Sequence, residues 1–236
     1  MGPELPPIAT REEWLAARRE LLDREKALTR ERDALNADRR RLPMVRVEKA
    51  YVFEGPDGPL GLLDLLDGRS QLIVRHFMFD PQWEDGCPSC SAAADEVSDG
   101  LLDHLHARDT TFVTVSRAPL AKIEAYKARR GWTFPWVSSH GSDFNYDFQA
   151  TLDESVAPPE YNFRPVEMEG EMPGHSCFLR DGDDVFHTYS VYARGAEMLG
   201  GSYYWLDLTA LGRQEDWEEP KGRAGAARGA RPDFAD

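Results

Sequence analysis

The chain has 236 residues, of which 42 are acidic and 28 are basic, so its formal charge is −14 at neutral pH. This length suits one substantial domain with additions, or two small ones. The negative charge argues against nucleic acid or an anionic membrane as a partner of the whole chain. No apolar run reaches the roughly 18 residues that a membrane helix needs. The N-terminus lacks the basic-then-apolar pattern of a secretory signal, so we expect a cytoplasmic protein.

The N-terminal part of the chain predicts a flexible start followed by a long helix. Residues 1–9 are rich in proline, and we expect them to be flexible. Thr10 and Glu13 have the spacing of a capping box, which predicts a helix within residues 10–43. An apolar residue recurs every seventh position, but the second heptad position is polar. This narrow stripe favours a helix packed along its own domain, and the alternative is an arm that joins a homodimer. The stripe consists of Trp14, Leu21, Leu28, Leu35 and Leu42.

Residues 44–211 have the pattern of one α/β domain. Strands rich in β-branched and aromatic residues are predicted at 45–47, 51–53, 71–79, 110–116, 134–139, 176–180 and 185–190. Helices are predicted at 88–107 with a break at Gly100, at 119–130, and from about 193. The acidic, loop-like segment at about 140–172 indicates an insertion. Residues 212–236 are rich in Gly, Ala, Arg and Asp, and this composition predicts a disordered tail.

Cysteine usage points to one site. The chain has three cysteines, and two of them, Cys87 and Cys90, lie in a Cys-Pro-Ser-Cys stretch between a predicted strand and a predicted helix. In a reducing compartment such a close pair is more often redox-active or metal-binding than structural. At a helix start, free N–H groups and the helix dipole favour a thiolate at Cys87. Parallel strands joined by crossover helices bind ligands at their carboxyl ends, and the cysteine pair falls at that edge. The order of strands and helices therefore predicts a thioredoxin-like sheet.

Several long motifs resemble those of one bacterial family. They lie at 77–90, 115–119, 134–139, 141–148 and 184–190, and the likeness extends over about residues 8–215. The sequence resembles a family of predicted dithiol–disulfide oxidoreductases of largely unknown function, and this resemblance implies a thioredoxin-like fold. Two departures stand out. Small residues at 91–94 replace the family's bulky aromatics, which implies space beside the thiols, and His175 and Cys177 replace aliphatic residues.

These residues support two main hypotheses. In the first, the protein is a thiol oxidoreductase without a cofactor. Cys87 attacks a small-molecule or protein disulfide, and Cys90 resolves the mixed disulfide. In the second, Cys87, Cys90 and His175, with Cys177 as a further candidate, bind copper or another soft metal, as a metal-binding protein or a metalloenzyme acting on a small molecule. The entry to the strand at His175 also resembles that of the copper-binding Sco proteins, which are thioredoxin-like assembly factors.

Two further alternatives are weaker. The stretches around Phe79 and Cys87 resemble the approach to the reactive cysteine of peroxiredoxins. However, Glu84 stands where those enzymes carry a threonine, and an acid there would repel the thiolate. A non-catalytic binding or dimer module is the other alternative, although the six tryptophans suit core and loop anchors better than a ligand site. His76 falls in the buried strand, and we expect it to be a hydrogen-bonded core residue.

Overall fold

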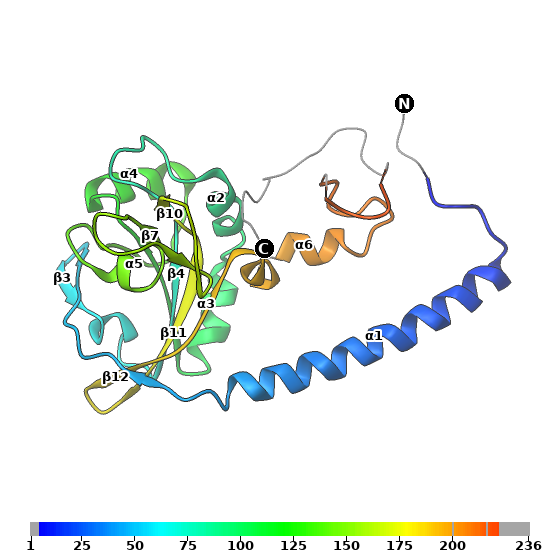
Figure 1. Cartoon of the computed structure of the whole chain (residues 1–236), viewed down its shortest axis with the longest axis horizontal. Helices are drawn as coiled ribbons and strands as arrows, with labels where there is room; N and C mark the ends of the chain where they lie inside the picture. The colour runs from blue at the N-terminus through cyan, green and yellow to red at the C-terminus, as the bar shows by residue number, and fades with distance from the viewer. Residues whose placement is uncertain (1–4, 200, 216, 222–236) are drawn as a thin grey trace. The chain divides into compact units, whose positions relative to one another are not determined.

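The computed structural model describes residues 5–199, 201–215 and 217–221. The described chain divides into two compact units. One is residues 44–204, and the other comprises the residues before Met44 together with those from Trp205 on. The larger unit is a mixed α/β domain with a curled central sheet flanked by helices, which confirms the predicted fold class (Figure 1). Within the described residues, no helix has the length and apolar character needed to cross a bilayer.

The described residues form six α-helices, two 3₁₀ helices and twelve strands. The helices are α1 (Arg11–Arg39), α2 (Pro88–Ala94), α3 (Asp99–His106), α4 (Leu120–Arg130), α5 (Phe144–Asp147) and α6 (Gly201–Leu206), with short 3₁₀ helices η1 (Asp64–Leu66) and η2 (Ala193–Leu199). The longer strands are β2 (Val52–Gly55), β3 (Gly58–Gly61), β4 (Gln71–His76), β5 (Thr110–Ser116), β6 (Trp136–Ser138), β11 (Gly174–Asp181) and β12 (Asp184–Tyr192). The two-residue strands are β1 (Val45–Arg46), β7 (Thr151–Leu152), β8 (Glu160–Tyr161), β9 (Arg164–Pro165) and β10 (Gly170–Glu171).

The main sheet has the strand order β1-β12-β11-β4-β5-β6-β2-β3. Strands β4, β5 and β6 are parallel and are joined by helical crossovers, α2 with α3 and then α4. Strand β11 runs antiparallel to β4 and continues into β12 as a hairpin. A strand–helix–strand unit whose first strand pairs with a later antiparallel hairpin is the thioredoxin-like arrangement, as the sequence predicts.

Strand β4 lies at the centre and contributes to two cores. Successive strand residues point to opposite faces of the sheet. Leu72 and Val74 pack in the core beneath β2 and α5, whereas Ile73 and Phe77 pack in the core beneath α2, α3 and α4. Both faces are therefore covered, which explains why the segment at 71–79 is largely apolar.

The predicted helix at 88–107 is broken, as expected, but the predicted position of the break is wrong. α2 ends at Ala94, and α3 begins at Asp99. The side chain of Ser98 accepts a hydrogen bond from the backbone N–H of Leu101 at 3.2 Å, so it caps a new helix. Gly100 lies inside the first turn of α3 and is not the break.

The segment at 140–172 is more regular than the predicted loop. It contains α5 and four short strands, in which β7 pairs with β10 and β8 pairs with β9. Aromatic residues fix it to the domain, because Phe144 and Phe148 belong to the core that contains Leu72 and Val74. The segment is thus a folded part of the larger unit.

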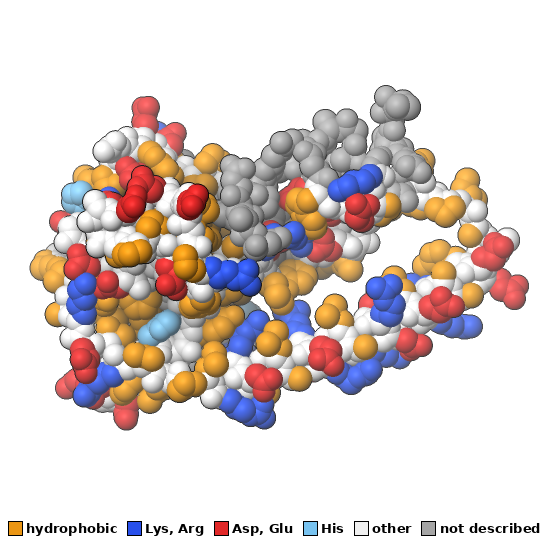
Figure 2. All heavy atoms as spheres, in the orientation of Figure 1, with side chains coloured by type: hydrophobic (Ala, Val, Ile, Leu, Met, Phe, Trp, Pro, Cys, Tyr) orange, Lys and Arg blue, Asp and Glu red, His pale blue; other side chains and the backbone are white. Residues whose placement is uncertain are grey.

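Helix α1 begins at the predicted capping box. The backbone N–H of Glu13 donates to the Thr10 hydroxyl at 3.2 Å, and Glu13 accepts the Thr10 N–H at 2.8 Å. None of the helix residues is buried, and Leu28 is 69% exposed. Apolar side chains lie at the surface along the helix between charged ones (Figure 2). Packing of this stripe on the domain or in a homodimer stays a prediction. Most of the predicted disordered tail, 212–236, lies outside the described residues, as do residues 1–4 of the flexible start.

Candidate functional site

Cys87 stands at the end of a loop that folds back on the end of β4. Its backbone N–H donates to the carbonyl of Met78 at 3.0 Å, so the first turn of α2 lies beside the residues that follow β4. Lys122 of α4 holds the loop, because its ammonium group donates to the carbonyls of Pro81 and Trp83 at 2.7 Å each. The cysteine pair therefore lies at the carboxyl end of the parallel strands, as predicted.

Gly86 sets the position of Cys87 through a close approach to the core. It is buried, and a Cβ atom there would lie 2.5 Å from the ring of Phe77. We expect Gly86→Ala to displace the loop, to destabilise the protein by about 1–3 kcal/mol, and to slow alkylation of Cys87. Urea denaturation and iodoacetamide kinetics measure the two effects. Gly100→Ala is the matched control, since its nearest contact would be 3.9 Å away. Equal effects of the two substitutions would contradict this role of Gly86.

The two thiols are electrostatically different. A hydrogen bond from the Cys90 thiol, aided by backbone and side-chain hydrogen bonds at Cys90 and Ser89 and opposed by burial, lowers the pKa of Cys87 to about 6. Interaction with Cys87, followed by burial, raises the pKa of Cys90 well above its ordinary value. Cys87 is half-buried and Cys90 is buried, and neither is in a disulfide. The pair thus combines a reachable thiolate with a protonated thiol behind it.

This difference predicts a pH profile for alkylation of the reduced protein. Because the pKa of Cys87 is lowered to about 6, its thiolate is present above that pH and is lost as the pH falls below it. We expect carbamidomethylation of Cys87, followed by mass spectrometry of its peptide, to rise through a midpoint near this pH. Cys177 serves as internal control, because burial raises its pKa to about 11. A Cys87 midpoint near the ordinary thiol value of about 8.5 would refute the assignment.

His175 does not complete a metal site with the cysteine pair. It lies on β11 opposite Arg75 of β4, and its Nε2 accepts a hydrogen bond from Arg75 Nε at 3.4 Å. Burial and the nearby Arg75 charge lower the pKa of His175 well below its ordinary value, so the ring is neutral. Among the described residues, no group of three His, Cys, Asp or Glu side chains could hold a metal ion. The structure therefore gives the copper hypothesis no support, and the Nε2 atom of His175 is already hydrogen-bonded to Arg75.

Cys177 is also separate from this pair. It lies two residues beyond His175 on the same face of β11, as strand alternation predicts. Its register partners are Ile73 on β4 and Tyr189 on β12. It is a partly buried free thiol and joins no metal-binding group in the described part of the chain.

The comparisons with known proteins place the chain in a family. The profile of a family described as "Bacterial protein of unknown function (DUF899)" matches residues 3–228. The chain belongs to this family. The match confirms the expected resemblance to a bacterial family of unknown function, and it supplies no substrate. A search of curated proteins returned no match for this DUF899 protein.

Solved structures similar to the DUF899 protein include peroxiredoxins. A bacterioferritin comigratory protein from Xanthomonas campestris has 14% identity and a TM-score of 0.43, over 63% of this chain and 84% of that one. The peroxidoxin BcpB from Mycobacterium tuberculosis has 16% identity and a TM-score of 0.41, over 62% and 84%. A 2-Cys peroxiredoxin from Plasmodium vivax has 11% identity and a TM-score of 0.42, over 67% and 89%. Likeness this distant carries no argument about activity, and it does not support the Sco-type resemblance.

Two of the four small residues after Cys90 are packed against their neighbours. The Ser91 hydroxyl donates to the carbonyl of Cys87 at 2.9 Å and contacts the hydroxyl of Tyr126 from α4 at 2.8 Å. Ser91 is 3% exposed and Ala94 is fully buried. The space predicted beside the thiols is therefore filled at Ser91 and Ala94, whereas Ala92 is exposed and Ala93 is half-buried.

A buried carboxyl group near the same end of the sheet was not predicted. Glu171 of β10 accepts the hydroxyl of Thr151 at 3.1 Å and faces the guanidinium of Arg117 at 3.3 Å. Burial, partly opposed by Arg117, raises the pKa of Glu171 to about 7. Arg117 directly follows β5, but Glu171 lies in the segment expected as a loop, where the sequence gives no periodic signal.

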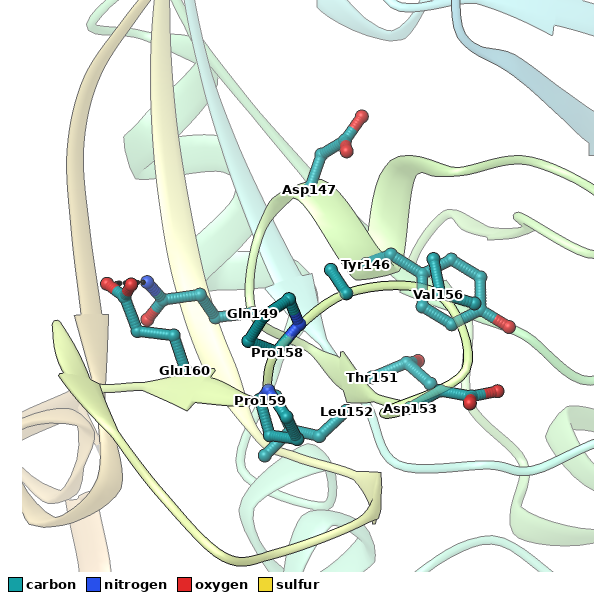
Figure 3. A pocket seen from close by; sticks show the side chains of 11 residues that line it. Tyr146, Asp147, Gln149, Thr151, Leu152, Asp153, Val156, Pro158, Pro159 and Glu160 are labelled. Atoms are coloured by element: carbon teal, nitrogen blue, oxygen red, sulfur yellow. Dashed lines mark hydrogen bonds between the residues drawn. The ribbon is translucent and has the colours of Figure 1, made fainter.

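A small cavity of about 210 Å³ lies in the segment at 140–172 of this DUF899 protein (Figure 3). Tyr146, Val156 and Pro158 contribute to its lining, and Gln149 bridges to Glu160 with a hydrogen bond of 3.1 Å. Its lining includes none of the cysteines. The cavity is therefore separate from the thiol pair.

Proposed function

We propose that this DUF899 protein is a thiol-based oxidoreductase that reduces disulfides with Cys87 and Cys90. The observation that carries the proposal is the unequal pair at the start of α2. Cys87 has a pKa of about 6 and is half-buried, and Cys90 is buried and protonated. A nucleophile ionised at neutral pH beside a second thiol is what two-step disulfide exchange requires.

The reaction proceeds in two displacements. The Cys87 thiolate attacks one sulfur of the substrate disulfide, so a Cys87–substrate disulfide forms and the other substrate sulfur leaves as a thiolate. The Cys90 sulfur, after losing its proton, bonds to the Cys87 sulfur and displaces the second substrate thiolate. Two electrons pass from the cysteine pair to the substrate, which ends as two thiols. An external dithiol then reduces the Cys87–Cys90 disulfide.

The chain's own groups support the first displacement. The hydrogen bonds that lower the pKa of Cys87 keep its sulfur ionised at neutral pH, as an attacking thiolate must be. Pro88 occupies the first turn of α2, where its missing N–H costs no hydrogen bond and its fixed φ favours the helix. The helix start beside the Cys87 thiolate is therefore rigid. The substrate class we propose is a small-molecule or protein disulfide, and the compartment is the reducing cytoplasm.

The test uses the reduced protein carrying Cys177→Ser, so that only the pair contributes thiols. On mixing with excess 5,5′-dithiobis(2-nitrobenzoate), we expect two aromatic thiolates per chain and one intramolecular disulfide. Added dithiothreitol should then give repeated turnover. Two protein–aromatic mixed disulfides per chain, or no reaction, would contradict the proposal. Much faster oxidation of the pair by hydrogen peroxide than by the disulfide would contradict the substrate class.

A further inference from the structure

Arg75 is a buried cation beneath the helix that carries the thiol pair. It is 7% exposed, and its side chain leaves β4 on the face covered by α2. Its Nη2 donates to the carbonyl of Ala93 at 3.3 Å, and its Nε donates to His175 Nε2 at 3.4 Å. The guanidinium carbon also lies 5.5 Å from the centre of the Phe112 ring. Its Nη1 has no hydrogen-bond partner within the described residues.

The guanidinium of Arg75 has no carboxylate in direct contact among the described residues. No carboxylate of the described chain forms an ion pair with Arg75, although burying a charge is costly unless it is compensated. The groups that act on it electrostatically are Cys90 from α2 and Glu96 from the turn after α2. Glu96 already accepts the backbone N–H groups of Gly201 and Ser202. His175 is neutral, so among the groups that act on Arg75, Cys90 is the one that the proposed reaction makes negative.

The geometry of α2 places Cys90 on the side that Arg75 approaches. Residues three apart lie on the same side of a helix, so Cys90 and Ala93 share one side. Cys90 and Ala94 are buried in the core between α2 and the sheet, and this core also contains Phe112. The guanidinium thus lies under the turn of α2 that carries the second thiol.

We infer that Arg75 is a positioning residue that stabilises the Cys90 thiolate while Cys90 attacks the mixed disulfide. This inference rests on the proposed function. In that step the Cys90 thiol gives up its proton, its sulfur bonds to the Cys87 sulfur, and the departing substrate thiolate takes up a proton. Negative charge develops on a buried sulfur, and the fixed positive charge of Arg75 offsets it. His175 holds the guanidinium in place through its Nε2.

The rates of the two displacements distinguish this role of Arg75 from a purely structural role. In the Cys177→Ser background, stopped-flow absorbance resolves the first aromatic thiolate, released by Cys87, from the second, released by Cys90. We expect Arg75→Met to slow the second release about tenfold or more, which corresponds to a rise of about one unit in the pKa of Cys90. The first release should be nearly unchanged. Arg75→Lys keeps the charge and should recover most of the rate. Ile73→Val, on the same face of β4 two residues away, is the control for altered packing and should change neither phase.

An unchanged second release in Arg75→Met, or equal slowing of both releases, would overturn the inference and leave the proposed function standing. Absence of two-step release in the parent protein would instead remove the proposed function. If circular dichroism shows that Arg75→Met is unfolded, the pH profile of the second release is compared between the parent protein and Arg75→Gln, which keeps a polar side chain without the charge. A higher midpoint in Arg75→Gln supports the role of Arg75, and an unchanged midpoint overturns that role.

Discussion

Replacing Cys87 with serine is expected to lower the rate of disulfide exchange by on the order of a thousandfold or more, because it removes the nucleophile of the first displacement. A serine hydroxyl is not ionised at neutral pH and cannot replace the thiolate whose pKa is about 6. Aromatic thiolate release at saturating disulfide, followed by its absorbance, measures the rate. The reaction that remains should come from the slow thiols, Cys90 and Cys177.

The other two cysteines give matched controls for this loss. Cys90→Ser keeps Cys87, so we expect one thiolate released per chain and a mixed disulfide that accumulates, visible as an added mass on the Cys87 peptide. Cys90→Ala also removes the hydrogen-bond donor to Cys87 and so raises the pKa of Cys87, and its first release should be slower at neutral pH than that of Cys90→Ser, whose hydroxyl can still donate. Cys177→Ser should keep the parent rate. If Cys87→Ser and Cys177→Ser behaved alike, Cys87 would not be the nucleophile.

Trp136→Ala is expected to lower the free energy of unfolding by about 3–5 kcal/mol, the usual cost of deleting a large buried ring. Trp136 is 1% exposed and lies centrally in the aromatic core beside the loop that carries Cys87. Its ring centre is 4.6 Å from that of Phe77, and its Nε1 donates to the Ser116 hydroxyl at 3.0 Å. Urea denaturation of the reduced protein, followed by circular dichroism, measures the loss.

Two controls separate packing from other effects of this substitution. Trp136→Phe keeps a ring and removes the hydrogen bond to Ser116, so its own cost should be smaller, about 1–2 kcal/mol. Val52→Ala alters a side chain that is 57% exposed and should change stability little. A loss below about 1 kcal/mol for Trp136→Ala would contradict a central role for this ring in the core.

The sheet and the position of the cysteine pair could be predicted because each leaves a local signal. The apolar run at 71–79 gave the central strand, and Cys87 and Cys90 followed it directly. The capping box at Thr10 fixed the start of α1. The break between α2 and α3 leaves a weaker signal, because Gly100 suggests a break although the Ser98 hydroxyl is the group that starts the new helix.

The surroundings of the pair could not be predicted, because they depend on contacts between distant parts of the chain. Arg75 and His175 are 100 residues apart and meet only through the register of β4 and β11. Without that register, the sequence suggests His175 as a metal ligand beside the thiols, which the structure does not support. Glu171 was missed for a similar reason, since its partners Thr151 and Arg117 come from separate elements.

Peptide mapping of the mildly oxidised full-length protein tests the central claim most directly. The account predicts one disulfide between Cys87 and Cys90 in nearly every chain, reversed completely by dithiothreitol, with Cys177 recovered as a free thiol. Recovery of Cys87 and Cys90 as unreacted thiols, or a disulfide that includes Cys177, would contradict it.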